Sequence, residues 1–103
     1  MSKKNQLMVM SLALIATGCT RDYTPESVAT GETIFQQACA ECHQAKDKSA
    51  PNFFFTLNDK NANPTYIAYK VHTGSLMMPK FPNIKGKKMR ALSEYVLEHS
   101  SIK

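Results

Sequence analysis

Cys39, Cys42 and His43 form the pattern that most narrows what this chain of 103 residues can fold into. Two residues separate the cysteines, and the histidine directly follows the second one. The chain has only one further cysteine, Cys19, so a scaffold held together by several disulfides is excluded. The pattern must therefore be a metal site, a redox-active dithiol, a buried structural pair or a point of covalent attachment.

Three of these alternatives fit the rest of the sequence poorly. A thioredoxin-like dithiol would need a strand–helix–strand setting, and no such pattern surrounds the cysteines. A zinc ion prefers four nitrogen or sulfur ligands. Cys39, Cys42 and His43 cannot readily bind one zinc ion together, and no second pair of ligands at suitable spacing is present. A buried structural pair of cysteines would leave the adjacent histidine unexplained.

The remaining alternative is covalent attachment of a haem, for which C-x-x-C-H is the motif. Each cysteine sulfur adds to one vinyl group of the porphyrin, and the two-residue spacing lets both reach the same ring edge. The histidine can then turn its imidazole toward the iron from one side. We therefore predict one covalent haem c, bound through Cys39 and Cys42 and ligated to the iron by His43.

The N-terminus has the pattern of an export signal. Two lysines precede an apolar run, residues 7–18, which is shorter than the roughly 20 residues of a transmembrane helix. The run leads into A-T-G-C, ending at Cys19, which resembles the lipobox of bacterial lipoproteins. This resemblance implies removal of a signal peptide, residues 1–18, and lipidation of Cys19. Ordinary cleavage near the same point is the alternative.

We accordingly expect an exported lipoprotein that is anchored in a membrane and faces the periplasm or the cell exterior. Residues 19–29 are polar and contain Pro25, so we expect a lipid-attached tether there. Residues 30–103 would then form one small domain. Chains of this size often need a cofactor or cross-link for stability, and the haem site is the candidate.

Three segments of the domain have helical patterns. The first runs from Thr30, a favoured N-cap, to about Gln44, and would place Phe35, Cys39 and Cys42 on one face. The second begins at Asn63-Pro64 and ends at Gly74. The third runs from about Gly86 to His99. No strand alternation is visible, so the predicted class is all-α.

Haem iron in cytochromes c commonly takes methionine as its second axial ligand. Residues 19–103 contain Met77, Met78 and Met89. Met89 lies on the apolar stripe of the third expected helix, where packing is the simpler role. Met77 and Met78 lie in a proline-containing segment, expected as a loop able to cover the far face of a haem. His72, in the second expected helix, is a further candidate.

Residues 28–100 resemble a class I monohaem cytochrome c of the small bacterial type, through GETIFQQACAECH, APNF, GSLMMPKF and ALSEYVLEH. The resemblance implies a cytochrome c fold, with three to four helices wrapped around one covalently bound haem. In that family the methionine ligand directly precedes a proline, which implies Met78. It also implies that the carbonyl group of Pro51 accepts a hydrogen bond from His43 and so supports this ligand.

The same resemblance implies how the first and last helices cross. Gly31 and Phe35 match residues that cross the last helix at Leu92 and Tyr95. A glycine at such a crossing allows close approach of the two backbones, and the two aromatic rings would seal it. The last helix departs from the pattern at its start, where Lys85 offers no side chain suited to N-capping.

The function implied by the resemblance is electron transport, with the iron cycling between Fe(II) and Fe(III) and no enzymatic reaction. The alternatives are a haem c subunit of a larger oxidoreductase and a haem-based ligand sensor. The formal net charge is +5, and residues 60–93 hold seven basic groups and no acid. Lys80 and residues 85–88 would either dock a redox partner with an acidic face or form a solvated surface. Nucleic acid is not expected as a partner, because no aromatic residues interleave with a basic run.

Overall fold

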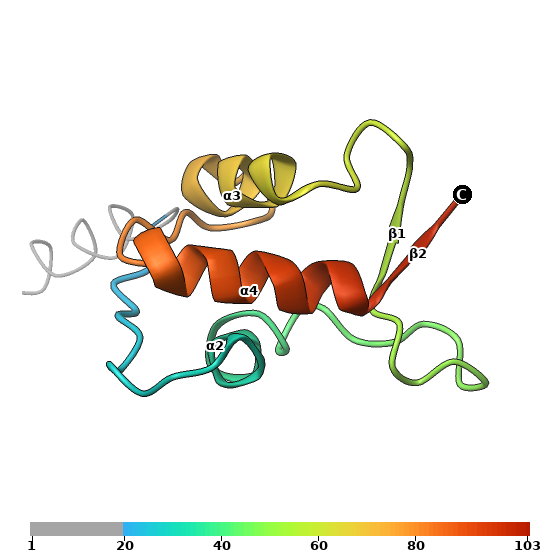
Figure 1. Cartoon of the computed structure of the whole chain (residues 1–103), viewed down its shortest axis with the longest axis horizontal. Coiled ribbons are helices and arrows are strands. Elements are labelled where there is room, and N and C mark those ends of the chain that lie inside the picture. Colours follow the sequence, from blue (N-terminus) through green and yellow to red (C-terminus); the bar gives the residue numbers. More distant parts are fainter. Residues whose placement is uncertain (1–19) are drawn as a thin grey trace, which may run out of the picture.

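The computed structural model describes residues 20–103; the expected signal peptide and Cys19 lie outside the described residues. The described chain contains three helices and two strands, in the order α2 (Gly31–Ala38), β1 (Phe55–Leu57), α3 (Pro64–Thr73), α4 (Gly86–Glu98) and β2 (Ser100–Ile102). Helices α2 and α3 both pack against α4, which lies between them in Figure 1. None of the helices within residues 20–103 is long and apolar enough to cross a membrane.

The predicted capping residues are confirmed at α2 and α3. The hydroxyl of Thr30 accepts a hydrogen bond from the backbone of Thr33 at 3.2 Å. The side chain of Asn63 accepts one from the backbone of Tyr66 at 2.8 Å. Gly74 follows the last residue of α3 with φ 64°, a conformation that glycine adopts without strain. The expected bounds of α3 and α4 agree with the structure to within one residue.

Helix α2 is shorter than the predicted segment. It ends at Ala38, and the backbone N–H groups of Cys39 and Ala40 both donate to the carbonyl oxygen of Phe35, at 2.8 and 2.9 Å. The chain then turns, and the N–H of His43 donates to the carbonyl oxygen of Cys39 at 3.0 Å. The prediction that both haem-site cysteines lie on one helical face is therefore wrong. Apolar spacing alone does not show where the regular hydrogen bonds of a helix end.

The all-α prediction is only partly right, because β1 and β2 form a small parallel sheet. Phe55 pairs with Ser100 and Leu57 with Ile102. The N–H of Lys103 also donates to the carbonyl oxygen of Leu57 at 2.9 Å. Strands of three residues are too short for the alternation that marks a strand in a sequence.

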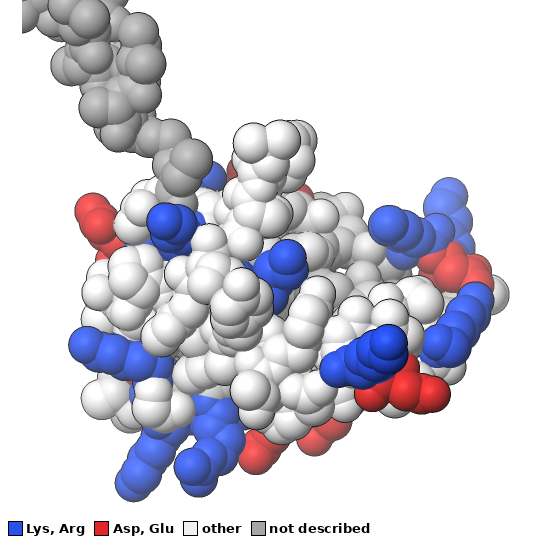
Figure 2. Space-filling model, turned by 90° about the horizontal axis from the view of Figure 1, so that it is seen from above, with Lys and Arg blue, Asp and Glu red and all other residues white. Residues whose placement is uncertain are grey.

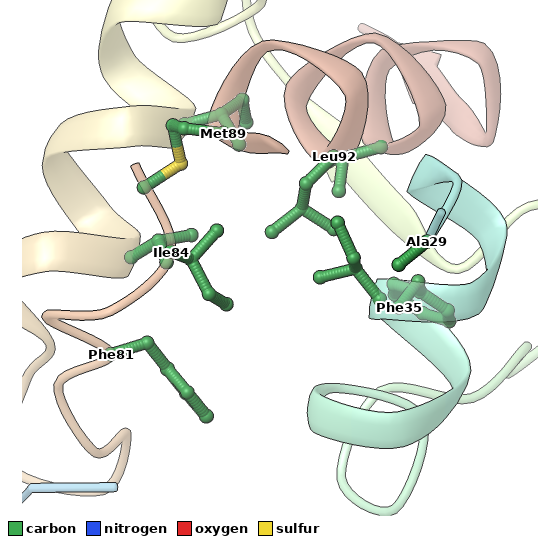
Figure 3. Packing of buried hydrophobic residues seen from close by; sticks show 10 residues of the cluster. Ala29, Phe35, Phe81, Ile84, Met89 and Leu92 are labelled. Carbon is green, nitrogen blue, oxygen red and sulfur yellow. The ribbon is translucent and has the colours of Figure 1, made fainter. Parts of the chain in front are cut away.

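The core lies where α4 meets the other two helices. Figure 3 shows Leu92 of α4 between Ile84 on one side and Phe35 of α2 on the other, and all three are fully buried. Met89 is also buried here, as expected for a packing residue. Phe81 is buried as well.

The predicted crossing of α2 and α4 is confirmed. The rings of Phe35 and Tyr95 lie 5.3 Å apart, centroid to centroid. A Cβ atom added to Gly31 would overlap the carbonyl oxygen of Ala91 and lie 3.0 Å from the Cβ of Tyr95. The closest neighbour of the glycine is thus Ala91, one residue before the expected Leu92.

Residues 20–29, expected as a tether, contact the domain at both ends. The N–H of Arg21 donates to the carbonyl oxygen of Lys80 at 2.8 Å. The ammonium group of Lys88 donates to the carbonyl oxygens of Ser27 and Ala29, at 2.7 and 2.8 Å. These residues therefore form part of the folded unit instead of a free linker. Their polar side chains gave no sign of this, because the contacts use mainly backbone groups of the segment.

Candidate functional site

A cavity of about 810 Å³ opens between the helices. Its volume falls within the range of roughly 300–1,000 Å³ that is usual for ligand pockets, and its lining is mainly apolar. Most of the described elements contribute to the wall. The lining residues are Arg21, Asp22, Tyr23, Gln37, Ala38, Cys39, Glu41, Cys42, His43, Phe55, Leu57, Tyr66, Ile67, Lys70, Val71, Ser75, Met77, Met78, Pro79, Phe81, Leu92 and Val96.

Both cysteines of the motif line this cavity as free thiols. Cys39 is half-buried, and Cys42 is exposed. Burial raises the pKa of Cys39 to about 11, and the neighbouring Cys42 adds to the rise. A redox-active dithiol depends on a cysteine whose thiol pKa is lowered, because the thiolate is the nucleophile. The environment of Cys39 therefore argues against the dithiol alternative.

His43 is half-buried, and its imidazole also lines the cavity. Its ring centroid lies 4.8 Å from that of Phe55, so β1 supports the ring. Burial lowers the pKa of His43, and the nearby ammonium group of Lys46 lowers it further. Both effects favour the neutral imidazole, which is the form that binds a metal.

The structure separates the candidates for the second axial ligand. Met77 and Met78 both line the cavity, whereas Met89 and His72 do not. Met77 is 90% exposed, and Met78 is half-buried and packs against the core. The Nε2 of His72 donates instead to the carbonyl oxygen of Ile84, at 3.1 Å. Geometry therefore favours Met78, the residue that precedes proline.

Pro51 is exposed and does not line the cavity. Among the hydrogen bonds of residues 20–103, none joins it to His43. The loop that contains it is tied instead to the end of α4, where Nδ1 of His99 donates to the carbonyl oxygen of Asn52 at 2.6 Å. Support of the haem ligand by Pro51 stays a prediction.

The N-terminal segment supplies part of the site that sequence reasoning missed. Arg21, Asp22 and Tyr23 all line the cavity. The hydroxyl of Tyr23 donates to the side-chain carbonyl of Gln37, on α2, at 2.7 Å. The one available signal was Tyr23 itself, a large aromatic residue in an otherwise polar segment.

Residues 26–96 match the model of one protein family, described as cytochrome c oxidase, cbb3-type, subunit III. The chain belongs to this family. The cbb3-type subunit III match identifies a cytochrome c domain, which confirms the prediction of a c-type cytochrome with covalently bound haem c and haem-based electron transfer. No curated protein and no solved structure matches the chain.

The cavity of this cytochrome c domain suits a haem. It presents two thiols, an imidazole and a thioether, which are the groups that attach and ligate haem in cytochromes c. These groups come from two parts of the chain, residues 39–43 and the loop after α3. The mainly apolar lining suits the flat faces of a porphyrin and limits the access of water to them.

Proposed function

We propose that the protein is a one-electron carrier at a membrane surface. Cys39 and Cys42 would hold the haem through thioether bonds, and His43 and Met78 would ligate its iron. The bound haem supplies the Fe(II)/Fe(III) couple. The observation that carries the proposal is that these four side chains, from two separate segments, line one cavity.

The chain contributes the ligands and their surroundings. An imidazole from His43 and a thioether from Met78 would leave no coordination position on the iron for a substrate, so we propose transfer of electrons without enzymatic turnover. A methionine ligand raises the reduction potential of the haem. Met78 is half-buried against the core, which would limit the access of water to this ligand.

Replacing Met78 with alanine tests the ligand. We expect the oxidised protein to lose the methionine-to-iron charge-transfer band in its visible spectrum, because no other thioether lining the cavity is packed against the core. Met77→Ala is the matched control, since Met77 is the neighbouring residue but is 90% exposed. This variant should keep the band.

Two results would contradict the proposal. Retention of the band in Met78→Ala would show that another group ligates the iron. Rapid binding of carbon monoxide to the reduced wild-type protein would indicate an open sixth position, and the ligand-sensor alternative would then be favoured.

Gly74→Ala provides a second prediction about this ligand. A Cβ atom at Gly74 would lie 2.5 Å from the carbonyl oxygen of Met78, and the φ of 64° disfavours any side chain. We expect the Met78 charge-transfer band to weaken, together with a loss of about 1–2 kcal/mol in stability. Gly86→Ala is the control, because its φ is also positive, 59°, but no atom lies within 4 Å. If both variants keep the full band, the contact at Gly74 does not control the ligand.

Attachment to the membrane is the part of the proposal that depends on the N-terminus. The lipobox-like residues before Cys19 support lipidation, and the preceding apolar run supports export to the periplasm or the cell exterior. The mass of the mature N-terminal peptide distinguishes a lipid-modified Cys19 from ordinary cleavage. A peptide that begins beyond Cys19 would contradict the anchor.

A fixed subunit of a larger oxidase is the second candidate, because the matching family is described as an oxidase subunit. Extraction in mild detergent, followed by size-exclusion chromatography, distinguishes a free carrier from a fixed subunit. A carrier should elute as a small protein, whereas a subunit should elute with its complex.

Docking of an acidic redox partner is supported by the excess of basic groups. Figure 2 shows Lys and Arg side chains spread over one face with uncharged surface between them. Lys88 is not expected to contact such a partner, because its ammonium group already donates hydrogen bonds to the carbonyl oxygens of Ser27 and Ala29. The salt dependence of electron transfer to the physiological partner would test this charge effect.

A further inference from the structure

The segment that carries Met78, residues 75–81, is here called the Met78 loop. One hydrogen bond lies within the loop itself, and a second ties its far end to helix α3. The N–H of Ser75, directly after the C-cap of α3, donates to the carbonyl oxygen of Met78 at 2.9 Å, and the N–H of Phe81 donates to that of Val71 at 3.0 Å. The tip of the loop has little packing, because Leu76 is 97% exposed and Met77 is 90% exposed.

A second element holds the loop from outside α3. Residues 20–23, here called the N-terminal strap, run beside it. Thr20 pairs with Lys80 in a parallel bridge, and the N–H of Arg21 donates to the carbonyl oxygen of Lys80 at 2.8 Å. Lys80 is only two residues beyond Met78. The side chain of Asn83 also donates to the carbonyl oxygen of Asp22, at 3.1 Å.

The other end of the strap reaches the opposite side of the cavity. Tyr23 donates to Gln37 on α2, two residues before Cys39. In Figure 1 the strap is the start of the blue segment, which leaves the orange loop beside α4 and continues toward α2. Since α2 and α3 both pack mainly on α4, the strap joins the two ligand-bearing segments directly.

The strap lies outside the part of the chain that matches the family, which begins at residue 26. Three of its residues nevertheless line the cavity, as described above.

We propose that the N-terminal strap is a positioning element that keeps Met78 in place as the axial ligand. This inference rests on the proposed ligation by Met78. Among the hydrogen bonds of residues 20–103, the bond from Phe81 to Val71 is the one that ties the Met78 loop to α3, and the backbone bond from Arg21 to Lys80 opposes movement of the loop away from the cavity. Loss of one such bond should raise the population of the detached loop roughly fivefold.

The test compares Arg21→Pro with Arg21→Ala in the full-length holoprotein. Both variants lose the guanidinium group, but only the proline removes the N–H that donates to Lys80. Carbon monoxide binds to the reduced iron only when Met78 has left it, so its binding rate reports the detached population. We expect this rate to be roughly fivefold higher in Arg21→Pro than in Arg21→Ala. On heating, oxidised Arg21→Pro should lose its charge-transfer band at a lower temperature than oxidised Arg21→Ala.

Lys88→Met is the control for general destabilisation. It removes the hydrogen bonds to Ser27 and Ala29 but leaves the pairing at Lys80 intact. We expect it to lower the unfolding temperature without raising the carbon monoxide rate. A rise equal to that of Arg21→Pro would overturn the inference, because the effect would then follow stability alone.

Equal rates of carbon monoxide binding in Arg21→Pro and Arg21→Ala would also overturn the inference about the strap. If the proline variant does not fold, Asn83→Ala takes its place, and a rate equal to that of the wild type would count against the strap. Met78→Ala separates this failure from failure of the ligand assignment. If Met78→Ala binds carbon monoxide no faster than the wild type, the proposed ligation itself is wrong.

Discussion

Replacing Gly31 with alanine is expected to lower the free energy of unfolding by about 2–3 kcal/mol. The added Cβ atom would overlap the carbonyl oxygen of Ala91, and it would lie 2.8 Å from the carbonyl carbon of that residue and 3.0 Å from the Cβ of Tyr95. None of these atoms belongs to the flexible end of a side chain, so α2 and α4 must move apart. This movement would loosen the contact between Phe35 and Tyr95 and the buried core behind it. Denaturant unfolding of the holoprotein measures the loss.

Gly86→Ala is the matched control for this prediction. Its Cβ atom would meet nothing within 4 Å, so only the positive φ of 59° opposes it. That cost is about 1 kcal/mol. The larger valine side chain at Gly31 should prevent folding or detach the two helices. An alanine variant at Gly31 that is as stable as the wild type would show that the crossing is not tight.

Removal of the covalent haem should have the second large effect, which is loss of the cooperative fold. Without the haem, the mainly apolar lining of a cavity of about 810 Å³ would be exposed to water, which is unfavourable. Small domains are stable by only roughly 5–15 kcal/mol. The chain is therefore not expected to keep its helices packed around the open space.

The double variant Cys39→Ala/Cys42→Ala tests this expectation. In the wild type the covalent haem should stay attached to the chain even in denaturant, whereas the double variant should lose it. The far-ultraviolet circular dichroism of the double variant should show reduced helix content. Cys42→Ala alone is the control, because one thioether remains to hold the haem. Cooperative thermal unfolding of the double variant near the temperature of the wild type would mean that the haem is not needed for folding.

Local patterns predicted the parts of this protein that depend on neighbouring residues. Thr30 and Asn63 cap helices because their side chains reach backbone groups three residues away. The spacing of Cys39, Cys42 and His43 indicated a covalent haem through chemistry contained in five consecutive positions. The proline after Met78 singled out a residue that the structure then places, half-buried, in the cavity wall.

Contacts between distant segments were not visible in the same way. Pairing of Phe55 with Ser100 and of Thr20 with Lys80 uses backbone groups, which every residue carries. Such pairing leaves little mark on side-chain composition, so the sheet and the strap were missed. The early end of α2 has a similar cause, because the backbone N–H groups of Cys39 and Ala40 share the carbonyl oxygen of Phe35 and the regular helical pattern stops there.

The sequence by itself determined the cofactor, the residues expected to attach it and the positions of α3 and α4. Each of these follows from side-chain chemistry at short spacing. Only the tertiary structure decided that one cavity gathers the thiols, His43 and Met78, and that residues 21–23 form part of its wall. Those features depend on how segments far apart in the chain pack and share backbone hydrogen bonds, which short spacing does not encode.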